Sequence, residues 1–194
     1  MDFVLDLDKS LFVFFNSLGS EYFDSFWLFI SESDIIEVIY LFLVIEFLRF
    51  FKIKDLKSIL IFILSMILMI VFTDQSSNFF KEFFERLRPC HNPELIEIIR
   101  IVKDGCGGLY GFFSAHAANT FAFASFIYFL TPNENNYKRT SFLLFIWAAI
   151  ISYSRIYIGV HFPLDIIIGA IYGLLSGYLF HKPFIYFRKS KLIL

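Results

Sequence analysis

Long hydrophobic runs alternate with short polar segments along most of the chain. The runs cover residues 35–48, 59–73, 117–130, 142–152 with an apolar continuation to 160, and 166–180. None shows the alternation of a barrel strand, and a backbone inside lipid must satisfy its own hydrogen bonds. The pattern therefore predicts an all-α fold, a polytopic bundle built on five membrane-spanning helices.

The first 31 residues follow a weaker pattern. Two amphipathic stretches, 11–15 and 23–30, are interrupted by polar residues and flank a turn at Gly19. We predict two interfacial helices here. A sixth span is the alternative, so the bundle is expected to hold five to six transmembrane helices. The N-terminus is acidic and lacks the basic region of a secretory signal, so we expect it to be retained.

Composition supports a membrane protein. Of the 194 residues, 58% are hydrophobic and 18% are charged, against roughly 25% charged in an average soluble domain. The mean hydropathy is +0.68, which disfavours both a soluble and a disordered chain. A net charge of -1 offers no basic field for nucleic acid, and the length suits one domain over residues 1–194. The expected partners are the bilayer and a substrate; the oligomeric state stays open.

The distribution of basic residues predicts the orientation. Lys and Arg follow the first, third and fifth spans, at Arg49, Lys52, Lys54, Lys57, Lys138, Arg139, Lys182, Arg188, Lys189 and Lys191. Because short loops rich in these residues stay in the cytoplasm, those ends are predicted to be cytoplasmic. The segment 87–111 then lies outside although it holds Arg88, Arg100 and Lys103. Anion binding is the reason we infer for these three charges.

Polar residues gather at the outer ends of the predicted spans. Strict alternation brings one set to a single membrane face: Lys81, Arg88, Ser114, His116, Arg155, His161 and Asp165. Ionisable residues within a membrane are functional candidates, with pairing inside the bundle as the plainer alternative. On the second span, Asp74, Asn78, Lys81, Glu85 and Arg88 recur at helical spacing. That spacing predicts one polar stripe on a helix that Pro89 stops, or else a solvated helix end.

The last span carries a carboxylate on a glycine face. Asp165, Gly169, Gly173 and Gly177 follow one another at intervals of four, which suits close packing against another helix. A buried carboxylate needs a donor, and His161 stands four residues earlier. If the helix begins near Pro163, His161 lies within reach of Asp165, which would orient the imidazole and stabilise a positive ring.

These residue types suit phosphate better than a metal. Two histidines, one lysine and two arginines lack metal-ligand spacing, so we expect neither a metal nor another cofactor. Phosphoryl transfer needs cations around the oxygens, an in-line nucleophile and an acid for the leaving oxygen. Lys81, Arg88 and Arg155 supply the cations, His161 the nucleophile and His116 the acid. Ser114 and the backbone amides at the start of the third span add donors.

Cys90 and Cys106 lie in the same outer segment. A disulfide between them would hold that segment over the site, and two buried free thiols are the alternative.

Three motifs in this region resemble the type 2 phosphatidic acid phosphatase superfamily. They are Lys81-EFFERL-Arg88-Pro89, Phe113-Ser114-Ala115-His116, and Ser154-Arg155-IYIGV-His161-FPL-Asp165. The first and third match the family pattern fully in order and spacing. The second has Phe113 and Ala115 where the family has Pro and Gly, and Ala115 keeps the backbone N–H that would point at phosphate.

The resemblance implies a metal-independent lipid phosphatase that works through a phosphohistidine. It implies that His161 is the nucleophile, Asp165 its orienting partner and His116 the general acid. Lys81, Arg88 and Arg155 would bind phosphate, together with Ser114 and Ala115. It also implies a multi-pass protein of the bacterial inner membrane whose active site faces outward.

Substrate choice is the least determined feature. Undecaprenyl pyrophosphate is our first expectation. Arg100 and Lys103 would then meet its second phosphate at the mouth of the site, and solvated loop charges are the alternative for these two residues. The alternatives are lipid A, phosphatidylglycerophosphate and phosphatidic acid. A membrane protein that binds or transports an anion without hydrolysing it is the alternative from another class.

Overall fold

A computed structural model of the chain describes residues 2–50, 53–103, 105–131 and 135–192. Over these residues the chain is all-α. Its helices are α1 (Asp2–Ser17), α2 (Glu21–Ser31), α3 (Ser33–Phe50), α4 (Leu56–Phe84), α5 (Ala115–Leu130), α6 (Asn135–Tyr157) and α7 (Pro163–Leu192), with a short 3-10 turn η1 (Pro89–His91). Each predicted apolar run lies within one of the helices α3 to α7, which confirms the all-α class; the continuation of the fourth run to residue 160 passes beyond the end of α6 at Tyr157.

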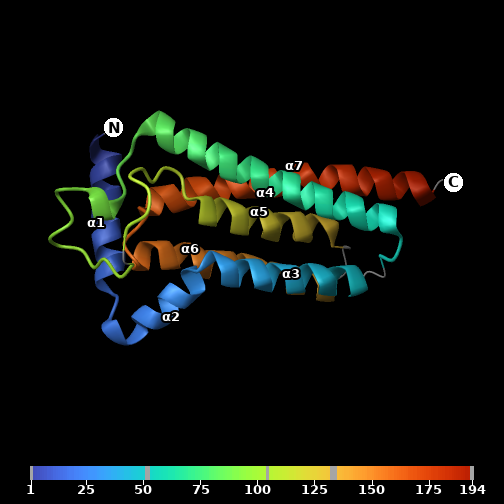
Figure 1. Cartoon of the computed structure of the whole chain (residues 1–194), viewed down its shortest axis with the longest axis horizontal. Coiled ribbons are helices and arrows are strands. Elements are labelled where there is room, and N and C mark those ends of the chain that lie inside the picture. The colour runs from blue at the N-terminus through green and yellow to red at the C-terminus, as the bar shows by residue number, and fades with distance from the viewer. Residues whose placement is uncertain (1, 51–52, 104, 132–134, 193–194) are drawn as a thin grey trace.

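The helices form an elongated bundle with a transverse helix at one end. Helices α3 to α7 run along the long axis, whereas α1 crosses the end of the bundle and α2 leads obliquely back to it (Figure 1). The two predicted N-terminal helices are present on either side of Gly19. The transverse course of α1 is the one expected of an interfacial helix.

Two helices in the described part of the chain are long and apolar enough to cross a bilayer by themselves. They are α4, over Leu56–Phe84, and α7, over Pro163–Phe187. Leu60, Leu64 and Ile67 on α4 are each about half exposed, as expected of side chains that face lipid. Helices α3, α5 and α6 are shorter or more charged, but they run alongside α4 and α7 (Figure 1).

Helix α5 lies at the centre of the bundle against the glycine face of α7. Ala117, Ala118 and Ala122 on α5 are fully buried. A Cβ added at Gly173 would lie 2.9 Å from the Ala122 nitrogen and still closer to the Ala118 carbonyl oxygen. Small residues on both helices therefore let the two backbones approach closely, as the glycine spacing predicts.

Gly173→Ala is expected to destabilise the bundle by about 1–3 kcal/mol, because the added methyl overlaps the α5 backbone. The measurement is thermal unfolding of the purified protein in detergent. Gly108→Ala is the matched control, since a Cβ at Gly108 meets nothing within 4 Å and that position has no left-handed backbone. Equal melting temperatures for the two variants would contradict the close α5–α7 contact.

The end of α4 differs from the predicted polar stripe. The helix stops at Phe84, and Glu85 caps it with a left-handed φ of 47°. The chain then pairs with a later segment, as the Arg88 nitrogen donates to the Leu109 carbonyl at 3.1 Å. The residue before a proline also disfavours helical backbone, so Arg88 leaves the helix before Pro89 is reached. The stripe prediction was wrong for Glu85 and Arg88.

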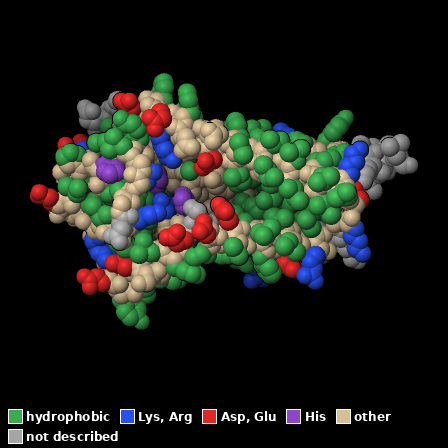
Figure 2. All heavy atoms as spheres, viewed as in Figure 1, with side chains coloured by type: hydrophobic (Ala, Val, Ile, Leu, Met, Phe, Trp, Pro, Cys, Tyr) green, Lys and Arg blue, Asp and Glu red, His purple; other side chains and the backbone are tan. Residues whose placement is uncertain are grey.

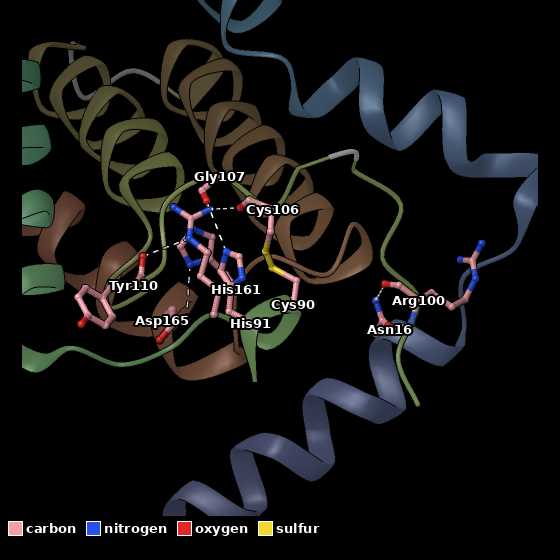
Figure 3. Close-up of a disulfide and its surroundings, with 10 residues drawn as sticks. Asn16, Cys90, His91, Arg100, Cys106, Gly107, Tyr110, His161 and Asp165 are labelled. Atoms are coloured by element: carbon pink, nitrogen blue, oxygen red, sulfur yellow. Dashed lines mark hydrogen bonds and ion pairs between the residues drawn. A yellow bond between two sulfur atoms is a disulfide. The ribbon is translucent and has the colours of Figure 1, made fainter. Parts of the chain in front are cut away.

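The predicted cysteine pair is joined in the structure. Cys90 and Cys106 form a disulfide, with Cα atoms 6.1 Å apart, inside the long segment between α4 and α5 (Figure 3). The bond links the two sides of this segment at the end of the bundle that carries α1. Among the described residues, Cys90, His91 and Cys106 lie close enough together to hold a metal ion. The disulfide uses the sulfur atoms of both cysteines in this group.

Candidate active site

A cavity of about 420 Å³ opens between the helices near the α1 end of the bundle. Its lining includes five of the predicted site residues, which are Lys81, Arg88, Ala115, His116 and Arg155. Figure 2 shows basic and histidine side chains gathered in a hollow of this face, with acidic side chains around them. Residues far apart in the sequence thus meet at one end of the bundle, as span alternation predicts.

His161 lies in the loop between α6 and α7. It is buried and is not among the cavity lining, but Arg155, Arg88 and Lys81, which do line the cavity, are close enough for their charges to act on it. Gly159, with a φ of 88°, turns the chain back after α6, and α7 begins at Pro163 as predicted. His161 Nδ1 is 3.5 Å from Asp165 Oδ2, and both side chains are buried. Asp165 Oδ2 also accepts the Phe162 N–H at 2.9 Å. The imidazole is therefore held beside a fixed carboxylate.

The surroundings of His161 favour the neutral ring. Burial lowers the pKa of His161 well below its usual range, and the positive charges of Arg155, Arg88 and Lys81 act in the same direction. At neutral pH the imidazole is therefore unprotonated. A neutral ring can offer a lone pair to phosphorus, whereas an imidazolium cannot.

Arg88 is fixed by the backbone of the disulfide-linked segment. Its Nε donates to the Tyr110 carbonyl at 3.1 Å and its Nη1 donates to the Cys106 carbonyl at 2.9 Å. Gly107 has a φ of 78°, and a Cβ there would lie 3.1 Å from Arg88 Nη1. The segment therefore wraps closely around the guanidinium and sets its direction.

Arg155, in the last turn of α6, is almost completely buried. Its Nη1 donates to the carbonyl of Ser31 at 3.4 Å and also contacts the Ser31 hydroxyl. The Arg155 Nε has no hydrogen-bond partner among the described residues. Buried donors are rarely left unsatisfied, so an anion in the adjacent cavity is a fitting acceptor. Lys81, which also lines the cavity, donates weakly to Asn78 at 3.4 Å.

The start of α5 brings backbone donors and His116 to the cavity. Ser114 caps the helix, because its hydroxyl accepts the Ala117 N–H at 3.4 Å. The Ser114 N–H donates to the Asp165 carbonyl at 3.1 Å, and the residue is fully buried. Ser114 therefore connects α5 to Asp165 and is not among the cavity lining, whereas Ala115 and His116 are.

Arg100 does not belong to this site, contrary to the prediction. Its Nη2 donates to both carboxylate oxygens of Asp24, at 3.0 and 2.9 Å, and its guanidinium lies 5.6 Å from the Tyr157 ring centre. Figure 3 shows it beside Asn16, away from His161. An ion pair that fastens α2 explains this outer charge. Lys103, by contrast, is close enough to His116 to act on its ring electrostatically.

Sequence reasoning missed two charged residues at this end of the bundle. Arg86 stands at one of the unspecified positions between Lys81 and Arg88 in the first motif. It forms ion pairs with Asp165 and with Asp8 of α1. The sequence shows only that the N-terminus is acidic, and nothing in it singles out Asp8. No periodicity connects residues 8 and 86, so only the folded chain brings them together.

The bundle thus has apolar outer faces and, at one end, a cavity lined in part by Lys81, Arg88 and Arg155. The chain belongs to the PAP2 superfamily, whose model matches residues 56–189. It is therefore a lipid phosphatase, a hydrolase, and an integral membrane protein of bacterial type.

Two curated relatives match nearly the whole chain. Both are described as lipid A 4'-phosphatases, from Porphyromonas gingivalis and Bacteroides thetaiotaomicron. The first is 34% identical over 194 residues, covering 97% of this chain and 77% of the relative. The second is 34% identical over 184 residues, covering 93% of this chain and 78% of the relative.

Two solved structures share the fold. Aquifex aeolicus LpxE has a TM-score of 0.61 and 27% identity, and the match covers 91% of this chain and 95% of that one. A transmembrane PAP2-type phosphatidylglycerolphosphate phosphatase from Bacillus subtilis has a TM-score of 0.69 and 22% identity, covering 93% and 85%. Because its sequence identity to this chain is only 22%, the second structure shows only that the two chains share the PAP2 transmembrane fold.

Proposed function

We propose that this protein hydrolyses a phosphate monoester of a lipid A-type saccharolipid and releases inorganic phosphate. The observation that carries the proposal is the match along nearly the entire chain to two lipid A 4'-phosphatases. It favours lipid A, one of the alternatives from the sequence, over the undecaprenyl pyrophosphate that we expected first. The cavities of this chain supply independent support.

An apolar groove reaches the phosphate cavity from the membrane-facing side. It has a volume of about 380 Å³ and is lined mainly by apolar residues of α3, α4 and α5, including Ile36, Leu41 and Ile67. His116 and Asn119 line both the groove and the phosphate cavity. An acyl chain in the groove would therefore place its phosphorylated head group beside His116.

The remaining polar lining of the phosphate cavity suits a sugar. Glu37, Asp74, Gln75 and Asn119 share the cavity with the cations. Carboxylate and amide oxygens accept hydrogen bonds from sugar hydroxyls. The two carboxylates would repel the second phosphate of a lipid pyrophosphate, because like charges brought together cost free energy. This arrangement favours a monoester on a hydroxyl-rich head group.

The reaction we propose has two displacements at phosphorus. Nε2 of His161 attacks the phosphorus as the bond to the sugar oxygen breaks, and His116, which must enter this step as the imidazolium, gives its proton to that oxygen and becomes neutral. Asp165 stabilises the positive imidazole of the phosphohistidine. His116 then accepts a proton from water, whose oxygen attacks phosphorus and releases inorganic phosphate and neutral His161. Arg88, Arg155 and the amides of α5 stabilise the equatorial oxygens.

The proposed location is the bacterial inner membrane, with the cavity on the outer side. Lys57 and Lys138 lie in the first turns of α4 and α6, whereas the cavity residues Lys81 and Arg155 lie in the last turns of the same helices. Lys182 lies in the C-terminal half of α7, and basic residues favour the cytoplasmic side. Release of phosphate in the presence of EDTA would support the metal-independent mechanism that the motifs imply.

The test is phosphate release by the purified protein in one detergent with EDTA. We expect kcat/KM for lipid A to exceed that for a C55 pyrophosphate by about tenfold or more, since one electrostatic clash of 1.4 kcal/mol suffices for that factor. Phosphatidic acid and phosphatidylglycerophosphate complete the panel, and His161→Ala protein sets the background. A tenfold preference for any other lipid overturns the substrate assignment.

A further inference from the structure

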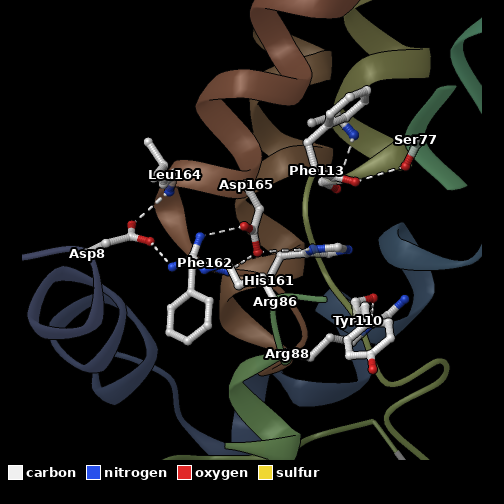
Figure 4. A network of polar contacts seen from close by, with 12 residues as sticks. Asp8, Ser77, Arg86, Arg88, Tyr110, Phe113, His161, Phe162, Leu164 and Asp165 are labelled. Carbon is white, nitrogen blue, oxygen red and sulfur yellow. Dashed lines mark hydrogen bonds and ion pairs between the residues drawn. The ribbon is translucent and has the colours of Figure 1, made fainter. Parts of the chain in front are cut away.

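A chain of charged side chains connects α1 to the carboxylate beside His161 (Figure 4). Arg86 donates from Nη1 to Asp165 Oδ1 at 2.7 Å and from Nη2 to Asp8 Oδ2 at 2.5 Å. The other oxygen of Asp8 accepts the Leu164 N–H at 2.8 Å. The Arg86 side chain is 18% exposed, while those of Asp8 and Asp165 are 5% and 0% exposed.

These contacts leave the Asp165 carboxylate little freedom to rotate. Oδ1 faces Arg86, and Oδ2 faces the Phe162 N–H and His161 Nδ1. The Arg86 guanidinium is itself held over the Phe162 ring, 4.3 Å from the ring centre. Rotation of the carboxylate would break an ion pair and a backbone hydrogen bond together. Asp165 therefore keeps Oδ2 toward the imidazole.

The charges of the network also fit the chemistry. A single arginine paired only with Asp165 would cancel the negative charge that a positive imidazole needs. Asp8 provides a second carboxylate, so the group of Asp8, Arg86 and Asp165 carries one net negative charge. Arg86 thus counters the cost of burying Asp165 ionised, while Asp8 restores the negative field at His161.

We propose that Asp8 and Arg86 are positioning residues for the phosphatase reaction, which hold Asp165 ionised and aimed at Nδ1 of His161. The inference rests on the proposed role of His161 as nucleophile. Asp8 and Arg86 are linked to His161 through Asp165, so both act by way of that carboxylate. The N-terminal helix, outside the three motifs, is thereby part of the catalytic machinery.

The first readout separates kcat from KM. Asp8→Asn is expected to lower kcat by about 10- to 100-fold, by analogy with the loss of a partner that orients a metal-ligating histidine, with KM within twofold. In that variant Arg86 has only Asp165 as a counterion and is drawn toward Oδ2, where it competes with His161. Arg86→Gln is expected to lower kcat similarly, because Asp165 then lacks its counterion.

The second readout is the acid limb of the pH profile of kcat/KM. Its midpoint reports protonation of the nucleophile in the free enzyme. The charged groups that face His161 are Lys81 of α4, Arg88 of the long segment, His116 of α5, Arg155 of α6 and Asp165 of α7. Asp8→Asn removes a negative charge from this field, so the acid limb should move to lower pH. Arg86→Gln removes a positive charge, so its limb should move to higher pH.

The controls separate positioning from simple attachment of an N-terminal helix. Asp24→Asn breaks the Arg100 ion pair that fastens α2, and Asp6→Asn makes the same chemical change on an exposed part of α1. Neither should shift the acid limb. Arg86→Lys keeps the charge, so it should leave the limb in place and recover part of kcat. If Asp8→Asn does not fold, the two Arg86 variants decide.

All variants are assayed in detergent with lipid A and with a soluble aryl phosphate. Failure of the wild-type protein on lipid A alone would reject the proposed substrate and leave the positioning test intact on the aryl phosphate. Wild-type kcat in Asp8→Asn would overturn the inference. So would limbs that stay in place, or that move together in Asp8→Asn and Arg86→Gln, because attachment alone would produce either result.

Discussion

His161→Ala is expected to reduce phosphate release to the background of the assay, because no other group in the described part of the chain is placed to form the phosphohistidine. His116→Ala is expected to have a comparable effect on lipid A, since the sugar oxygen is a poor leaving group without a proton. Folding of both variants is checked in parallel, because His161 is almost completely buried and its truncation also leaves a cavity. Turnover is measured as released phosphate, and folding as the melting temperature in detergent.

The chain offers a matched control for the loss of a histidine. His181 lies on α7, stacked on Phe129, 18 residues beyond Pro163, which corresponds to about 27 Å along the helix. His181→Ala should therefore retain activity. The two catalytic variants are further distinguished with an aryl phosphate, whose leaving group needs less protonation. There, His116→Ala should recover part of its activity, and His161→Ala should not. Activity of His161→Ala within tenfold of wild type would reject the nucleophile assignment.

The sequence predicts much of this site because the motifs are local. His161 and Asp165 are one helical turn apart, and Pro163 marks the start of α7, so their juxtaposition follows from short-range geometry. The gathering of Lys81 and Arg155 at the same end follows from alternating spans. Both kinds of inference depend on spacing and polarity, which a single sequence displays directly.

Other features depend on contacts between distant segments and could not be predicted. The early end of α4 arises from pairing of residues 87–88 with 109–110, which no pattern announces. The positions of Arg86 and Arg100 depend on which acidic residue folds against each. Two outer charges that look alike in sequence therefore have different roles, since Arg86 supports Asp165 and Arg100 fastens α2.

The substrate could not be predicted from the sequence for a related reason. The motifs describe the phosphate and the reacting atoms, which all lipid phosphates share. In the proposed function, discrimination would depend on groups such as Glu37 and Asp74, which lie on α3 and α4 and line the cavity only after those helices pack.

Arg155→Gln is expected to lower kcat by about 10²–10³, the usual effect of removing one preorganised donor from a developing negative charge. Arg155 is suited to this role because its guanidinium is buried, is anchored at Nη1 by Ser31, and has no hydrogen-bond partner for Nε among the described residues. Arg155→Lys keeps a positive charge but loses the planar set of donors, so its rate should also fall substantially. The two variants differ more clearly in their dependence on pH.

The sign of that dependence follows from the field at His161. The Arg155 cation is one of the charges that hold the pKa of His161 below its usual range. Removing it in Arg155→Gln raises that pKa toward the ordinary value near 6.5, so the ring becomes protonated at a higher pH and the acid limb of kcat/KM moves upward. In Arg155→Lys the charge remains, so the limb should stay near its wild-type position. A limb that is unmoved in Arg155→Gln would mean that Arg155 does not act on the nucleophile, and a reduced rate would then reflect phosphate binding alone.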